Sequence, residues 1–147
     1  MSRTANLRRQ HEAAVALVGR IIERSKALEQ DGVPYEVSLL LAKLTGTLRI
    51  HFAQEDRTLY PHMIASSHMD AATTAAEFQE EMGGLSGEFE AFAERWQSAR
   101  VLAADPAGFR ADAAVIFGAL AKRIEREDAH LYKLADAIED WQVRRSA

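Results

Sequence analysis

A histidine and a glutamate, His51 and Glu55, stand four residues apart in a segment with helical periodicity. This spacing stacks the two side chains on one face of a helix, as metal sites in helical bundles require. Leu44, Leu48 and Leu59 continue the same face, so the pair is predicted to point into the core. The alternative is an ordinary His–Glu pair on a helix surface.

Other polar residues interrupt apolar faces elsewhere in the chain, where burial is costly unless a partner neutralises them. His11 interrupts the face of the first helical segment. Glu127 interrupts the face of the last one, with Arg123 one turn before it and His130 about one turn after it. Glu81 flanks the face of the third segment. An Arg123–Glu127 salt bridge and boundary positions for His11 and Glu81 are the alternatives.

Four helices must position these side chains. Apolar residues recur with a period close to 3.6, and no useful stretch alternates with a period of two. Helices are predicted over Thr4–Gln30, Pro34–Ser66, Asp70–Ser98 and Pro106–Val143, with no sheet. Long amphipathic helices joined by short loops favour an all-α fold, an antiparallel up-down-up-down four-helix bundle. Residues 1–147 are assigned to this single domain.

Proline and glycine mark the helix boundaries. Residues 31–34, DGVP, predict the end of the first helix and the start of the second. Pro61 falls inside the second apolar pattern, so a kink or break is expected at Tyr60. Asp105 is the expected N-cap of the last helix, with Pro106 as its first helical residue.

The apolar faces predict which residues form the core. Val15 and Ile22 are assigned to the buried face of the first helix, and Trp141 to that of the last. Gly83 and Gly84 interrupt the third helix, where paired glycines predict a bend or the close approach of another backbone.

The candidate polar residues are predicted to lie at one depth. His11 stands about 19 residues before the end of its helix and His51 about 17 after the start of the next, which is nearly the same height at 1.5 Å per residue. Counting residues from the helix ends in the same way places Glu81 at about the height of Glu55, and Glu127 at about the height of Glu81. Three buried carboxylates repel one another unless a cation neutralises them. Mixed imidazole and carboxylate ligands suit iron, manganese or zinc better than calcium or copper.

Two segments resemble motifs of the hemerythrin-like family, the HHE cation-binding domains. Residues 51–61, HFAQEDRTLYP, are similar to the family motif H-x-x-x-E-[ED]-x-x-L-Y-P. His11 matches the histidine of the family's first helix. Residues 124–132, IEREDAHLY, resemble the second motif, H-I-x-x-E-[ED]-x-x-L-Y, with Arg123 in place of its histidine. The resemblance covers nearly the whole chain and implies a bundle around a non-haem, usually di-iron, centre.

The expected ligands combine imidazoles with carboxylates. The candidates are His11, His51, Glu55, Glu81 and Glu127, with His130 as an optional ligand. The histidines would be terminal ligands, whereas Glu55 and Glu127 would bridge or chelate. Non-haem iron is the expected cofactor, as a di-iron centre by the resemblance, with manganese or zinc as alternatives. Tyr60, Tyr132 and Arg123 are expected beside the ligands.

This chain also departs from the family pattern. The histidines of the third helix are absent, and Gln79, Glu80 and Glu81 occupy that stretch. A centre richer in carboxylate favours ferric iron, so irreversible reaction with oxygen or peroxide is predicted over reversible oxygen carriage. The fixed charge of Arg123 could instead replace one metal, which would leave a mononuclear or empty site.

Three classes of function follow. The leading prediction is a metal-binding protein that senses or reacts with oxygen, peroxide or nitric oxide. The second is a degenerate bundle that acts as a signalling or protein-interaction module, with a homodimer or a signalling partner. The third is a small di-iron oxidase or peroxidase, although no nucleophile–base pair and no phosphate loop accompany it.

Composition excludes several other classes. The chain has 147 residues, 27% of them charged, and no cysteine, which excludes disulfide scaffolds, iron–sulfur clusters and thiol nucleophiles. A net charge of −4 argues against nucleic acid as a partner. No apolar run approaches the ~20 residues that a membrane helix needs. No apolar signal region follows the basic start, so a cytoplasmic location is expected.

Overall fold

The computed structural model describes residues 4–138, which are helical almost throughout and contain no strand. The prediction of an all-α protein is therefore confirmed. The four long helices are α1 (Ala5–Ser25), α2 (Val33–Gln54), α4 (Met69–Trp96) and α6 (Pro106–Arg126). A π-helical turn, η1 (Glu55–Leu59), joins α2 to the short α3 (Tyr60–Ile64). A second one, η2 (Glu127–Leu131), follows α6 and leads into helical residues 132–138.

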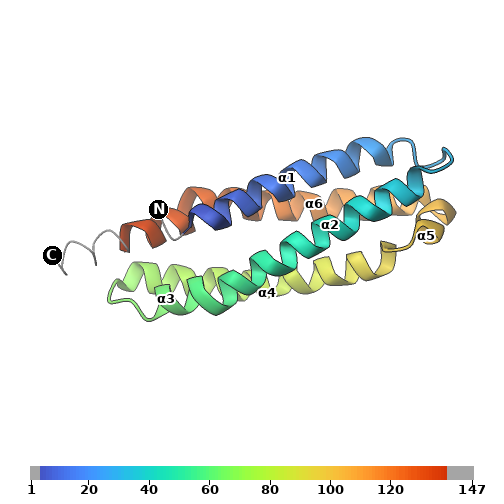
Figure 1. Ribbon diagram of the computed structural model, residues 1–147. Helices are drawn as coiled ribbons and strands as arrows, with labels where there is room; N and C mark the ends of the chain where they lie inside the picture. The colour runs from blue at the N-terminus through green and yellow to red at the C-terminus, as the bar shows by residue number, and fades with distance from the viewer. Residues whose placement is uncertain (1–3, 139–147) are drawn as a thin grey trace.

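The long helices lie side by side, and each runs opposite to the one before it (Figure 1). α1 packs along α2 and α6, and α4 packs along the same two helices. The Thr4 hydroxyl donates to the Asp136 carboxylate at 2.8 Å, so the start of α1 and the end of the last helical stretch meet at one end of the molecule. None of the helices within residues 4–138 is both long and apolar enough to cross a membrane.

The predicted helix boundaries agree with the structure at most ends. Gly32 adopts a φ of 83° in the turn before α2, a left-handed conformation that favours glycine. Asp105 caps α6, since its Oδ1 accepts a hydrogen bond from the Gly108 N–H at 3.0 Å. Two differences stand out. α1 ends at Ser25 and gives way to turns, and a short helix that was not predicted, α5 (Ala99–Ala104), precedes α6.

The interruption expected at Tyr60 takes the form of the π-helical turn η1. Pro61 has no N–H to donate, and the Tyr60 N–H reaches back five residues to the Glu55 carbonyl. η2 repeats this geometry, with the Tyr132 N–H bonded to the Glu127 carbonyl. Both π turns begin at the glutamate of a motif. A π turn is wider than an α-helical turn, so in each case the glutamate and the tyrosine that follows it by five residues lie on one face of the helix.

The apolar core is divided in two. The larger cluster fills the end of the molecule near α5 and includes Leu44, Phe92 and Phe109. The smaller one fills the opposite end and includes Leu59, Phe78 and Tyr132. Between them lies a layer of buried polar side chains, and the helices that meet there make up the candidate centre.

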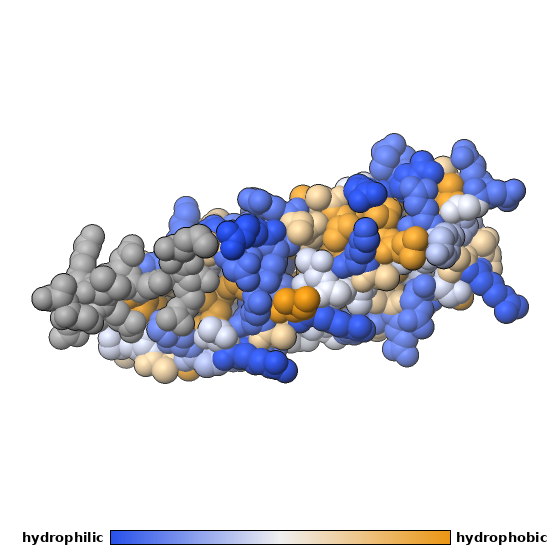
Figure 2. All heavy atoms as spheres, in the orientation of Figure 1, coloured by the Kyte–Doolittle hydropathy of each residue, from blue (hydrophilic) through white to orange (hydrophobic). Residues whose placement is uncertain are grey.

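One predicted part of the core is wrong. Val15 and Ile22 are exposed by 53% and 45%, whereas Ile21 is buried in their place. Figure 2 shows apolar side chains gathered on this face, over α1 and α2. The buried face of α1 follows Leu7, His11, Ala14, Ile21 and Ser25. Trp141, also predicted to be in the core, lies outside the described residues.

The glycines of α4 do not mark a close approach. A Cβ added at Gly83 or Gly84 would meet no atom within 4 Å. A Gly84→Ala substitution should therefore stabilise the fold by about 0.5–1 kcal/mol, because it lowers the entropy of the unfolded chain. Gly32→Ala should destabilise it by about 1 kcal/mol, because alanine is strained at positive φ. The free energy of unfolding from denaturant titration checks both, and equal stability of the two variants would contradict the assignment.

Candidate metal centre

Two imidazoles, two carboxylates and a guanidinium are buried in the layer between the two apolar clusters. They are His11 from α1, His51 from α2, Glu55 from η1, Arg123 from α6 and Glu127 from η2. Both glutamates are 0% exposed. The structure thus brings together four of the six residues that were predicted as ligands, at the common depth that helix counting indicated.

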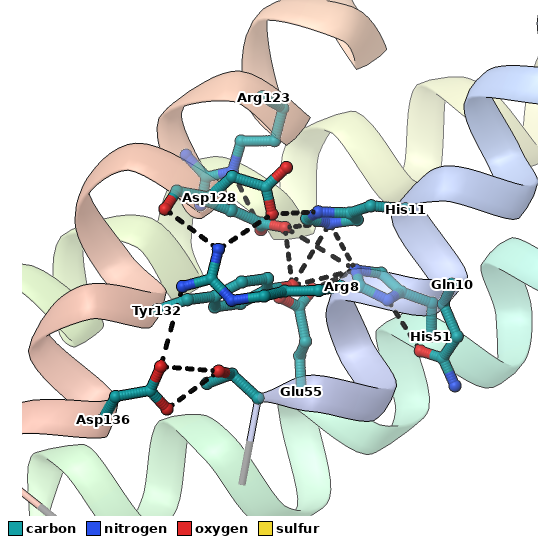
Figure 3. Close-up of polar contacts among 11 residues, drawn as sticks. Arg8, Gln10, His11, His51, Glu55, Arg123, Asp128, Tyr132 and Asp136 are labelled. Carbon is teal, nitrogen blue, oxygen red and sulfur yellow. Dashed lines mark hydrogen bonds and ion pairs between the residues drawn. The ribbon is translucent and has the colours of Figure 1, made fainter. Parts of the chain in front are cut away.

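The two imidazoles face one another through their Nε2 atoms. These atoms are 3.1 Å apart, and the Glu127 Oε1 lies 2.9 Å from the Nε2 of His11. The same oxygen lies 3.6 Å from the Nε2 of His51, and Glu55 Oε1 lies 3.2 Å from it. Figure 3 shows the side chains of His11, His51 and Glu55 pointing toward one another.

The outer nitrogens of both rings are fixed by hydrogen bonds. The Nδ1 of His11 lies 2.8 Å from the Asp128 carboxylate, which can only accept, so the imidazole donates there. The Nδ1 of His51 lies 2.8 Å from the Gln10 Oε1. The amide of Gln10 is oriented by its own donation to the Gln54 Oε1 at 2.8 Å. The Nε2 atoms of both rings are therefore directed into the centre, the arrangement that partners of metal-binding histidines impose.

The carboxylates retain unused acceptor atoms. Glu55 Oε2 accepts a hydrogen bond from the Tyr132 hydroxyl at 2.9 Å, whereas the buried Oε1 accepts none. The buried Glu127 Oε2 likewise accepts none. The Tyr132 hydroxyl also lies 3.2 Å from Glu127 Oε1 and 3.2 Å from the Nε2 of His11, so it faces the same point. Each of the two unused oxygens nevertheless faces a basic nitrogen, since His51 Nε2 lies 3.2 Å from Glu55 Oε1 and Arg123 Nε lies 3.4 Å from Glu127 Oε2. Buried carboxylate oxygens require such a cationic group, or a metal ion in its place.

Protonation follows from these contacts. Burial alone would lower the pKa of His51, but the hydrogen bonds and charges of Glu127 and Glu55 raise it to about 9. Burial and then the charge of Glu127 raise the pKa of Glu55 above its ordinary range. Burial opposes ionisation of Glu127 as well, yet the contacts with His11 and His51 hold its pKa below the usual range. A proton on His51 therefore neutralises part of the layer when no metal is bound.

The donor set fits a metal ion. Atoms of His11, His51 and Glu127 all lie within 4.8 Å of one another. Ligand atoms that are each about 2.0–2.2 Å from one ion stand roughly 3 Å apart at right angles, close to the separations above. Imidazole nitrogens with carboxylate oxygens are a donor set for iron, manganese or zinc. Glu55 would be a fourth ligand, in addition to His11, His51 and Glu127.

Glu81 and His130 do not join this centre. Glu81 is half exposed and pairs with Arg123 at 2.7 Å and with Arg126 at 2.6 Å. Counting along α4 gave its depth correctly, but its side chain lies at the α4–α6 surface. His130 is exposed, and its ring lies 6.3 Å from the ring of Phe78. The π turn of η2 directs Tyr132, rather than His130, towards Glu127.

The three residues expected beside the ligands are all buried there. Tyr132 touches both histidines and both glutamates. Tyr60 is fully buried at the equivalent place after η1. The Nε of Arg123 lies 3.4 Å from Glu127 Oε2, so the predicted pair with Glu127 forms inside the core.

Sequence reasoning missed the two residues that orient the histidines. Asp128 directly follows the motif glutamate, and Gln10 directly precedes His11. The acidic residue after each motif glutamate was a usable signal for Asp128. Nothing local marks Gln10, because its role depends on how α1 packs against α2.

Comparison with known protein families gives a match over most of the chain. The sequence model of the hemerythrin HHE cation-binding domain matches residues 2–135. No curated protein and no solved structure gave a match.

The raised pKa of His51 makes the stability of the metal-free protein depend on pH. Its pKa of about 9 in the fold exceeds the ordinary value of 6.5. The stabilisation is therefore complete below pH 6.5 and is lost as the pH rises through about 9. We expect the free energy of unfolding to fall by about 1–3 kcal/mol over this interval. Denaturant titration with a chelator present measures it. His51→Gln should flatten the profile and His130→Gln should not, and a flat profile in the wild type would contradict the assignment.

Proposed function

Because this chain belongs to the hemerythrin HHE cation-binding domain family, we propose that it binds iron at the centre formed by His11, His51, Glu55 and Glu127. The observation that carries this proposal is the pair of Nε2 atoms, 3.1 Å apart, with their outer nitrogens fixed by Asp128 and Gln10. The framework would be an up-down-up-down four-helix bundle with the centre between its two apolar clusters.

We further propose that the centre senses or reacts with dioxygen, peroxide or nitric oxide, rather than carrying oxygen reversibly. Bound iron would supply a redox couple and an open coordination position for a small ligand. Two buried carboxylates beside two imidazoles favour the ferric state, which supports irreversible reaction over reversible binding.

The protein's own groups would control water and protons at this centre. The apolar clusters on either side keep bulk water from the layer, which strengthens every charge interaction inside it. The Tyr132 hydroxyl retains its proton, since burial and the nearby carboxylates raise its pKa, and it donates to Glu55 Oε2 at 2.9 Å. Asp128 is half-buried and lies between His11 and Arg8, and its carboxylate provides a polar contact from the Nδ1 of His11 to the surface.

Metal analysis tests the proposal most directly. Protein purified without chelator and loaded anaerobically with ferrous iron should retain iron through gel filtration. His51→Ala should lower the retained iron at least tenfold, because it removes one of two imidazole ligands. His130→Ala is the matched control and should retain as much iron as the wild type, since this histidine is exposed and outside the centre. Elemental analysis gives the iron content.

Two results would overturn the assignment. Wild-type protein without metal would contradict it and would favour the interaction module, with a homodimer or a signalling partner to be sought. Equal iron in His51→Ala and the wild type would place the metal elsewhere. Retention of manganese or zinc, but not iron, would change the metal and leave the site in place.

Oxygen exposure tests the proposed reactivity. Ferrous protein exposed to oxygen and then returned to vacuum should stay ferric, because the carboxylates stabilise that state. A ferrous-specific chelator after denaturation measures the fraction oxidised. Recovery of ferrous protein after oxygen removal would contradict the proposal and indicate a reversible carrier.

A further inference from the structure

α2 and α6 present the same local pattern to the core in two versions. Each has a basic residue, a glutamate four residues later, and a π turn that leads to a buried tyrosine. On the α2 side the basic residue is His51, and on the α6 side it is Arg123. Arg123 therefore precedes Glu127 by four residues, as His51 precedes Glu55. A guanidinium, however, only donates hydrogen bonds and does not ligate a metal.

Contacts on several sides hold the Arg123 side chain. Nη1 donates to Glu81 Oε2 at 2.7 Å, and Nη2 donates to the backbone carbonyl of Phe78. The guanidinium carbon lies 4.1 Å from the centre of the Phe78 ring. On the inner side, Nε lies 3.4 Å from Glu127 Oε2. Only 5% of the side chain is exposed, so this positive charge is a fixed part of the buried layer.

The Arg123 side of the layer is poor in ligands. The residues of α4 buried at this level are Phe78 and Met82, and neither offers imidazole or carboxylate. Glu81 is occupied by two arginines at the surface. On this side Glu127 Oε2 accepts no hydrogen bond and lies 3.4 Å from the Nε of Arg123, so the guanidinium already faces the oxygen that a second ion would need. The opposite side offers both imidazole Nε2 atoms.

The net charge of the buried layer also favours a single metal ion. The two buried glutamates and the guanidinium together leave one net negative charge in the layer. One divalent cation more than neutralises it. A second divalent cation would leave an excess of three positive charges between two apolar clusters, where uncompensated charge is strongly unfavourable.

We propose that Arg123 takes the place of a second cation, so that this centre binds one metal ion, held by His11 and His51 with the two glutamates. This inference rests on the proposed metal binding. It departs from the di-iron expectation that the family resemblance gave, because the residues that would hold a second ion are replaced by a guanidinium and apolar side chains.

Metal stoichiometry in matched variants tests the inference. Wild-type protein should bind one iron or manganese ion per chain. Arg123→His restores on α6 the His-x-x-x-Glu pattern of α2 and removes the fixed charge, so the content should rise towards two. Arg126→His is the control on the same helix, because Arg126 also pairs with Glu81 but is 53% exposed. It should stay at one ion per chain.

Each outcome decides a different question. Two ions in the wild type, or one ion in a folded Arg123→His variant, would overturn the role of Arg123 while leaving metal binding intact. No ion in the wild type would instead overturn the proposed function itself. If Arg123→His does not fold, electron paramagnetic resonance of manganese-loaded wild type decides. An isolated six-line signal supports one ion per chain, and a spin-coupled pair overturns the inference.

Discussion

Two carboxylates with no solvent exposure must be neutralised within the core, and the rest of the structure is organised around that constraint. Glu55 and Glu127 enter one layer from η1 and η2, between two apolar clusters. Their charge is too costly to leave unpaired at this depth. Two imidazoles on one side of the layer and a guanidinium on the other lie at ion-pair distance from these carboxylates and neutralise their charge.

The local backbone and the hydrogen bonds around the layer serve the same purpose. The π turns start at the two glutamates and place a tyrosine five residues later beside them. Asp128 and Gln10 hold the outer nitrogens of the histidines, so that the inner nitrogens face the carboxylates. A set of donors held in this way is ready to exchange protons for a metal ion, since metal binding requires neutral imidazole. Under the proposed metal binding, the difference between His51 and Arg123 would set how many cations the layer holds.

Most of the fold could be predicted from local patterns. The period of 3.6 predicted the long helices, and Gly32 and Asp105 marked two of their boundaries. The boundary of α1 and the short α5 were not predicted, because short helices and frayed ends depend on a few local contacts. Val15 and Ile22 were assigned to the core because they share a face with other apolar residues. Packing of α1 against α2 and α6 selected Ile21 instead.

The sequence by itself determined which residues are candidate ligands. A histidine and a glutamate four residues apart on an apolar face indicate an inward pair, and helix counting placed His11 and His51 at one height. Only the tertiary structure decided which side chains meet. Glu81 has the right height, but two arginines hold it at the surface. Tyr132, rather than His130, reaches Glu127 because of a π turn that its sequence does not reveal. Height along a helix follows from residue number, whereas the direction of a side chain depends on local backbone geometry and on the partner that neutralises its charge.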